Sequence, residues 1–157
     1  LLCLAKNIYY EAGLESREGM IAVAQVTMNR AEDEKFPKTV CGVVNQKTAV
    51  TKPEKVVKAT VVKGNFLKKD EVVKTTETHW YTVNVCQFSW VCENKPLPAP
   101  NNPVYVRALS IAYDVMANDK HNDLLPRSAV FFHALHVDPM WPYKKVKQIG
   151  NHIFYRK

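Results

Sequence analysis

The chain lacks any long apolar run and any closely spaced cysteine pair. No stretch of its 157 residues approaches the roughly 18 apolar residues that cross a bilayer, so we expect no stable membrane insertion. None of the four cysteines stands in a CxxC pair or beside an activating group, which argues against a zinc ribbon and against thiol catalysis. Disulfides and buried free thiols both stay open, and Cys86 and Cys92 could pair with each other or with Cys41.

The sequence also has no recognisable nucleic-acid-binding motif, although it is strongly basic. Its net charge is +7 and its pI about 9.2, a balance that favours an anionic partner such as an anionic cell-wall polymer or an acidic membrane surface. Neither a helix-turn-helix spacing nor a zinc-finger pattern occurs, so we predict no nucleic-acid binding. No basic region precedes the first apolar stretch, which Lys6 and Asn7 interrupt, so we do not expect it to act as a signal peptide.

Residues 47–85 differ in character from the rest of the chain. They hold eight lysines against four acids, which leaves a net +4, together with many Val and Thr residues. Alternation over 76–85 predicts a strand. The lysine-rich portion before it, with a turn signal at Gly64-Asn65, is expected to form a hairpin or a strand with a short helix. This segment is either a cationic element that holds an anionic wall or a solvated elaboration of the surface.

Local signals elsewhere predict one domain of helices followed by strands. Ser16 is a suitable N-cap for a helix that ends near Asn29 to Asp33, and Asn102 with Pro103 opens a helix that stops near Asn118-Asp119. The other expected elements are a helix over 1–12, a short apolar element over 40–44 that is extended or one helical turn, a turn over 139–142, and strands over 129–135 and 150–156.

Glu11 is the most informative single residue. It ends an apolar run directly after Tyr9 and Tyr10, and Gly13 follows in a loop-like segment. A carboxyl held against tyrosines at a helix end loses water, which raises its proton affinity and suits it to act as a general acid. The alternative is a boundary glutamate that faces solvent.

Several separated blocks carry a resemblance to a known family. They are CLAKNIYYEAGLESREGMIAVAQVTMNR at 3–30, FPKTVCGVV at 36–44, CQFSW at 86–90, AVFFHALHVDPMW at 129–141 and IGNHIFYR at 149–156. Together they resemble the SleB/CwlJ-type cell-wall hydrolases of bacteria and phages. The resemblance implies an α+β, lysozyme-like fold with helices around a small antiparallel sheet. It also implies a single catalytic domain over 1–157, with a basic insertion at about 47–85.

The same resemblance implies cleavage of the glycan strand of peptidoglycan, with the family's catalytic glutamate at Glu11. The chain departs from the family pattern next to it, because Gly13-Leu14 replaces the usual Arg-Gly, while Glu15 is retained. We therefore expect an enzyme that acts outside the cytoplasm, in the periplasm, wall or spore cortex, or that a phage encodes to attack its host's wall. We expect it to be a monomer.

The chemistry depends on how many carboxyl groups take part. Hydrolysis normally needs two, and Glu15 and Glu18 are the nearest candidates for the second. A lytic transglycosylase needs only one, because the muramoyl 6-hydroxyl closes a 1,6-anhydro ring, and we favour this reaction. A hydrolytic muramidase, an N-acetylmuramoyl-L-alanine amidase and an inactive wall-binding module stay open as alternatives.

The remaining site predictions concern substrate binding. Gln87 and Ser89 could bond sugar hydroxyls or orient Glu11, with Phe88 and Trp90 alternating along an extended segment; the aromatic pair could equally fill the core. His133, His136 and His152 do not form an HExxH-like pair on a helix, so we predict no metal and no cofactor. The residues predicted to contact substrate are Tyr10, Glu15, Gln87, Ser89, Trp90, His133, Trp141, His152 and Tyr155.

Overall fold

The computed structural model describes residues 1–118 and 124–157 and divides the chain into two compact units. The first, here called the helix–sheet unit, contains residues 1–46 and 86–157. The second, the hairpin unit, contains residues 47–85 and so covers the segment that we predict to be a basic insertion. That family members lack this segment stays a prediction.

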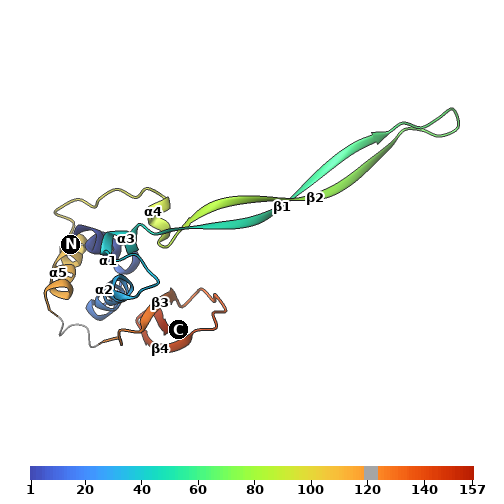
Figure 1. The fold of residues 1–157 in the computed structure, drawn as a ribbon. Helices are drawn as coiled ribbons and strands as arrows, with labels where there is room; N and C mark the ends of the chain where they lie inside the picture. Colours follow the sequence, from blue (N-terminus) through green and yellow to red (C-terminus); the bar gives the residue numbers. More distant parts are fainter. Residues whose placement is uncertain (119–123) are drawn as a thin grey trace. The chain divides into compact units, whose positions relative to one another are not determined.

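Helices and a small antiparallel sheet make up the helix–sheet unit (Figure 1). The sheet has three strands in the order β3-β5-β4, with both neighbouring pairs antiparallel. The elements in chain order are α1 (Leu2–Ala12), α2 (Arg17–Glu32), α3 (Val40–Val44), α4 (Ser89–Cys92), α5 (Pro103–Ala117), β3 (Ala129–Ala134), β4 (Lys144–Ile149) and β5 (His152–Arg156).

The predicted helix starts are confirmed. The Ser16 hydroxyl accepts a hydrogen bond from the Gly19 backbone N–H at 3.2 Å and caps α2. The Asn102 side chain accepts from the first two free N–H groups of α5, and Pro103 opens that helix. The last helical residue of α5 is Ala117, while Asp119, part of the predicted stop, lies outside the described residues.

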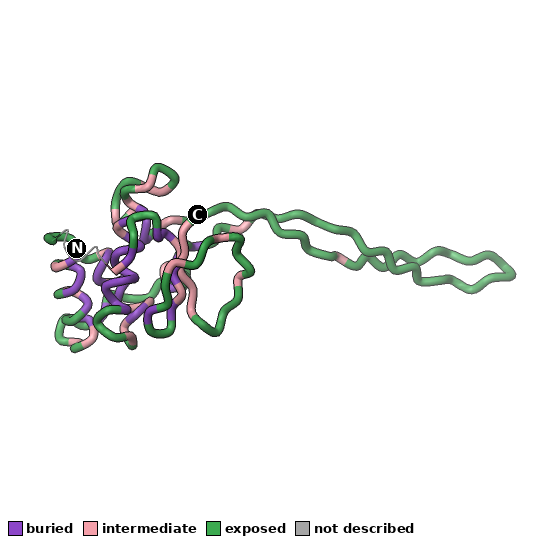
Figure 2. The backbone as a smooth tube through the Cα atoms, turned by 90° about the horizontal axis from the view of Figure 1, so that it is seen from below, coloured by how far each residue is buried: buried purple, intermediate pink, exposed green. Residues whose placement is uncertain are grey.

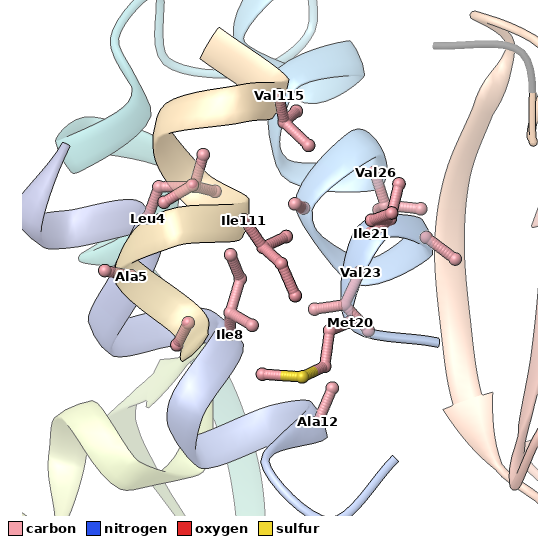
Figure 3. Close-up of a cluster of buried hydrophobic side chains, with 14 of the residues drawn as sticks. Leu4, Ala5, Ile8, Ala12, Met20, Ile21, Val23, Val26, Ile111 and Val115 are labelled. Carbon is pink, nitrogen blue, oxygen red and sulfur yellow. The ribbon is translucent and has the colours of Figure 1, made fainter. Parts of the chain in front are cut away.

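The hydrophobic core lies where α1, α2 and α5 meet (Figure 3). Helical spacing places apolar side chains on one face of α1 and of α5, whereas α2 is buried on all sides from residue 19 to residue 27. Burial of these apolar surfaces drives the three helices together. Fully buried members include Leu4 and Ile8 of α1, Met20 and Val23 of α2, and Ile111 of α5. Figure 2 shows the same concentration of buried residues in this unit.

Polar side chains at the end of α2 attach the helix to β3. The Asn29 amide donates to the carbonyl oxygens of Pro126 and Ala129, at 3.1 and 2.9 Å. Arg30 Nε donates to the carbonyl of Val130 at 2.6 Å. Because all these groups are buried or partly buried, the bonds fix the sheet's position against the helices.

Two parts of the predicted secondary structure differ from the structure. Strand β4 was not predicted, because its sequence, KKVKQI, is polar, and four of its six residues are exposed. The predicted extended CQFSW segment is wrong, because a short helix, α4, begins at Ser89. Extended chain would separate Cys86 and Cys92 by roughly 20 Å, whereas their disulfide holds the Cα atoms 5.8 Å apart.

The hairpin unit consists of strands β1 (Lys47–Val62) and β2 (Glu71–Cys86), joined by the loop 63–70 (Figure 1). The hairpin alternative of our prediction is thus confirmed for this segment. Nearly every residue of both strands is exposed (Figure 2). Lys58 and Glu77 form an ion pair at 2.9 Å between the strands. Within the described part of the chain, no helix is long and apolar enough to span a membrane.

Two disulfides pair all four cysteines. Cys3 of α1 is bonded to Cys41 of α3 across 38 residues, and Cys86 is bonded to Cys92 across six. The first bond therefore fastens the helix that carries Glu11 to a distant segment of the chain. The second closes only a local turn.

We expect the Cys3–Cys41 bond to contribute more stability than the Cys86–Cys92 bond. Cross-linking removes entropy from the unfolded chain in proportion to the logarithm of loop length. Replacing Cys3 and Cys41 by Ser should cost between about 3 and 4.7 kcal/mol, and replacing Cys86 and Cys92 less than about 3 kcal/mol. Urea unfolding of both double variants measures this difference. A larger loss for the Cys86–Cys92 variant would contradict it.

Candidate active site

The C-terminal end of α1 opens into a pocket with a volume of about 610 Å³. This is within the usual range for small-molecule sites. Residues of α1, the loop that follows it, α5 and the turn between β4 and β5 form its wall. The lining residues are Tyr9, Tyr10, Glu11, Ala12, Gly13, Leu14, Glu15, Val104, Ala134, His136, Asn151 and His152.

Glu11 is the carboxyl group in this pocket with the strongest perturbation. Burial removes water from it and raises its pKa from 4.5 to about 7, while the positive charge of Arg30 acts in the opposite direction. No residue of 1–118 or 124–157 donates a hydrogen bond to the carboxyl that would favour its ionised form. A substantial share of Glu11 is therefore protonated at neutral pH.

Arg30 supplies the nearby positive charge from inside the protein. It is only 2% exposed, and its guanidinium lies 5.4 Å from the ring centre of Phe36, 5.5 Å from that of Phe88 and 5.9 Å from that of Phe131. Burial lowers its pKa to about 10, and Glu11 opposes that shift. Since about 10 is well above neutral pH, Arg30 stays charged beside the acid.

The tyrosines that precede Glu11 are held in place by both ring contacts and hydrogen bonds. Their rings meet edge to face with centres 4.9 Å apart. The Tyr10 hydroxyl donates to the carbonyl of Pro96 at 2.6 Å. The Tyr9 hydroxyl accepts from the Asn102 amide at 3.4 Å. These contacts keep the wall of the pocket around Glu11 rigid.

Trp90 supports Tyr10 on the side away from the pocket lining. The two rings are stacked at 5.1 Å, and Trp90 is 6% exposed. Its indole N–H donates to Asn7 Oδ1 at 3.3 Å, and the Asn7 amide donates to Thr27 Oγ1 at 3.1 Å. Trp90 thus connects α4 to α1 and, through Asn7, to α2. It does not line the pocket.

The loop after Glu11 is fastened from two directions. Arg107 of α5 donates to the carbonyl oxygens of Gly13 and Glu15, at 3.2 and 3.4 Å. The Glu15 carboxylate accepts from the Asn151 backbone N–H at 3.1 Å and from its side-chain amide at 3.0 Å. Gly150 has φ +56°, and a Cβ there would overlap Glu15 Oε2, so the turn requires glycine.

His152 and His136 complete the wall opposite α1. His152 is 7% exposed, and its buried Nδ1 has no hydrogen-bond partner among the described residues. Burial lowers its pKa, Glu15 raises it, and His133 and His136 lower it. His152 is therefore neutral at neutral pH.

Four of the ten predicted site residues line the pocket: Tyr10, Glu11, Glu15 and His152. Three others, His133, Trp141 and Tyr155, lie together elsewhere on the helix–sheet unit. The Trp141 ring is 5.5 Å from that of His133 and 5.8 Å from that of Tyr155. His133 donates from Nδ1 to the Ala134 carbonyl and therefore, when neutral, accepts from the Tyr155 hydroxyl at Nε2, each at 2.8 Å.

The remaining predicted residues come from the CQFSW block. Gln87 and Ser89 are exposed, whereas Phe88 and Trp90 are buried, so the alternation is present although the segment is not extended. Neither Gln87 nor Ser89 lines the pocket. Among the residues that the structure describes, no group of three or more His, Cys, Asp or Glu side chains is arranged to hold a metal ion.

Sequence reasoning assigned no role to Arg30, Asn151 or Arg107. The burial of Arg30 carried no local signal, because a charged residue at the end of a helix is ordinarily exposed. Asn151 and Arg107 carried none, since their partners lie more than 90 residues away.

Solved structures with a similar fold are catalytic domains of SleB proteins. The catalytic domain of the germination-specific lytic transglycosylase SleB from Bacillus anthracis aligns with a TM-score of 0.57 and 19% identity, covering 99% of this chain and 92% of that one. The catalytic domain of Bacillus cereus SleB aligns with a TM-score of 0.54 and 20% identity, covering 99% and 88%. This likeness confirms the predicted lysozyme-like α+β fold. No curated protein matches the sequence.

The sequence itself identifies the family. The family model described as Cell Wall Hydrolase matches residues 14–155, nearly the whole chain. The predicted resemblance is thereby confirmed, and the chain belongs to the cell wall hydrolase family.

Proposed function

We propose that this cell wall hydrolase is a lytic transglycosylase that cleaves the glycan strand of peptidoglycan with Glu11 as its only acid/base. The observation that carries the proposal is the half-buried Glu11 carboxyl, whose pKa is raised to about 7 in a pocket of about 610 Å³. A group with this pKa can both donate and accept a proton near neutral pH. The family match begins after Glu11, at residue 14, so the role of Glu11 rests on this geometry and on the YYEA motif.

Family membership supports peptidoglycan as the substrate and a place of action outside the cytoplasm. Both disulfides fit an oxidising compartment. The Bacillus anthracis relative is itself described as a lytic transglycosylase, and at 19% identity that description lends support to the same reaction here without establishing it.

The first chemical step uses the protonated form of Glu11. Its carboxyl donates a proton to the glycosidic oxygen that links a muramoyl residue to the next sugar. The bond from the muramoyl C1 to that oxygen breaks, the leaving sugar departs as an alcohol, and positive charge develops at C1. Glu11 is left as a carboxylate.

The second step returns Glu11 to its starting form. The carboxylate accepts the proton of the muramoyl 6-hydroxyl while the oxygen of that hydroxyl bonds to C1. The product carries a 1,6-anhydro ring, no water is consumed, and the acid is regenerated. One carboxyl that titrates near neutral pH therefore serves both steps.

The hydrolytic alternative would need Glu15 as the second carboxyl, since it lines the same pocket. Both of its carboxylate oxygens already accept hydrogen bonds from Asn151. These bonds tie Glu15 to the turn between β4 and β5 and occupy both of the oxygens that would have to act on a water molecule or on C1. We therefore assign Glu15 to shaping the pocket and binding substrate, and we keep muramidase as the second candidate.

Substrate contacts divide into two groups in this proposal. Tyr10 and His152 would contact the sugar next to the scissile bond, because they line the pocket with Glu11. Trp141, which is 36% exposed, with His133 and Tyr155, would contact more distant sugars by aromatic stacking. Gln87 and Ser89 stay predictions for a contact outside the pocket.

Replacing Glu11 by Gln should abolish cleavage, because the amide keeps the shape of the side chain and cannot donate the proton. We expect a loss of at least about a hundredfold in kcat/KM on purified peptidoglycan. Mass spectrometry of the wild-type digest should find 1,6-anhydro-muramoyl ends.

The matched control is Glu18→Gln, which removes an exposed glutamate at the start of α2. It should cleave like the wild type. Reducing ends in the wild-type digest would establish a muramidase instead, and freed stem peptides an amidase. Wall binding without any cleavage would establish a binding module.

The pH profile should report the raised pKa of Glu11. The free enzyme must carry the proton, so kcat/KM should be nearly constant below pH 6 and fall about tenfold per pH unit above about 7. An alkaline limb with its midpoint near the ordinary carboxyl pKa of 4.5 would contradict the proposed environment. Steady-state rates on soluble glycan fragments measure the profile.

Arg30 should set the position of that limb. Its positive charge lowers the pKa of Glu11, so Arg30→Met should raise that pKa and move the limb to higher pH. Arg30→Lys retains the charge and loses the geometry of the bond to Val130, so its limb should stay near that of the wild type. Near-UV circular dichroism verifies the fold of both variants. An unmoved limb in folded Arg30→Met would show that the charge does not act on Glu11.

A further inference from the structure

We propose that the loop at the end of the hairpin unit binds the surface of an anionic lipid membrane. The loop comprises residues 63–70, with the sequence KGNFLKKD, between β1 and β2 (Figure 1). This inference does not depend on the reaction proposed above. It rests on three features of the loop: two fully exposed apolar side chains, a compact turn held by hydrogen bonds within the loop, and three lysines.

The two apolar side chains are Phe66 and Leu67. Phe66 is 103% exposed and Leu67 is 87% exposed, so neither contributes to a core. Adjacent large apolar side chains with this exposure are costly in water, and a functional contact is the usual reason for them. Figure 2 shows the whole loop as exposed.

Hydrogen bonds within the loop pair three of its backbone N–H groups and fold it into a compact turn. The Gly64 N–H donates to Asp70 Oδ1 at 2.9 Å, the Leu67 N–H to Asn65 Oδ1 at 3.1 Å, and the Lys68 N–H to the Asn65 carbonyl at 3.0 Å. A Cβ on Gly64 would overlap the Lys68 carbonyl oxygen, so glycine is required for this closed turn. These paired N–H groups add little desolvation cost to a contact with the membrane interface, and the remaining backbone groups keep the loop out of the hydrocarbon region.

The charges of the loop surround the apolar pair. Lys63, Lys68 and Lys69 are exposed, and the only acid of the loop, Asp70, is already bonded to Gly64. Lysines beside an anionic lipid surface each strengthen binding by on the order of fivefold. Bulky apolar side chains with lysines on both sides are the composition of an element that lies in the membrane interface.

The apolar pair Phe66 and Leu67 also favours a lipid surface over two other partners, a wall polymer and a second copy of the chain. An anionic wall polymer would be held by the lysines and could stack on Phe66, but it offers no apolar medium for Leu67. A second copy of the chain would bring two sets of three lysines together, which repel each other. A lipid surface satisfies both the lysines and the apolar pair.

The expected contact is peripheral, reaching about 5–10 Å into the interface. Strands β1 and β2 are exposed as well and carry apolar side chains such as Val57 and Trp80 between their lysines, so the contact proposed here is that of the loop alone. The absence of stable membrane insertion that the sequence predicts is compatible with such a contact. An enzyme of the wall would thereby be retained at the membrane side of its substrate.

The test is co-flotation of the full chain with vesicles of phosphatidylcholine alone or mixed with phosphatidylglycerol. We expect binding to the mixed vesicles and a loss of at least tenfold in the double variant Phe66→Ser/Leu67→Ser. The control double variant Leu97→Ser/Met140→Ser removes two apolar side chains that are 55% and 87% exposed in the helix–sheet unit, and it should bind like the wild type. Replacing Lys63, Lys68 and Lys69 by Gln should reduce binding by on the order of a hundredfold.

A second measurement tests directly whether the loop touches the lipid. Phe66→Trp should show tryptophan fluorescence that brominated lipids quench more strongly than in the wild type. No vesicle binding, or binding that the serine double variant retains, would overturn the proposal. Loop-dependent binding to insoluble wall without vesicle binding would assign the loop to a wall polymer, and a loop-dependent dimer in analytical ultracentrifugation would assign it to a second copy. Either result would also overturn it.

Discussion

The chemistry of this site depends on the pKa of Glu11. Loss of water raises this pKa, the buried positive charge of Arg30 lowers it, and together they place it at about 7. Arg30 can sit inside the protein because three aromatic faces and a backbone carbonyl surround it. The proposed acid/base chemistry depends on both effects, because together they place the pKa where the group can donate a proton and accept one near neutral pH.

The rest of the helix–sheet unit supports that pair. The Cys3–Cys41 disulfide and the core side chains fix α1, which carries Glu11, while Asn29 fixes α2, which carries Arg30, against β3. Glu15 and Asn151 then join the loop after α1 to the turn between β4 and β5, so the pocket has walls from both the helices and the sheet. The hairpin unit contributes none of the residues that line this pocket. Its loop 63–70 is assigned to membrane binding in our proposal, separately from the reaction.

Features that local chemistry determines were predictable from the sequence, and features that depend on distant partners were not. Ser16, Asn102 and Pro103 marked helix starts through their own side chains, and the YYEA motif marked Glu11. Strand β4 was missed because an exposed edge strand needs no apolar pattern, and α4 because a disulfide bends its segment. The cysteine pairing and the role of Arg30 depend on segments brought together only by the fold.

The most direct measurement of the central claim is an NMR titration of the Glu11 side-chain carboxyl carbon, assigned by comparison with the Glu11→Gln protein. The carboxyl should titrate with a midpoint near pH 7, well above its ordinary value of 4.5. A midpoint near 4.5 would mean that water reaches the group freely, and it would contradict Glu11 as an acid that is protonated at neutral pH.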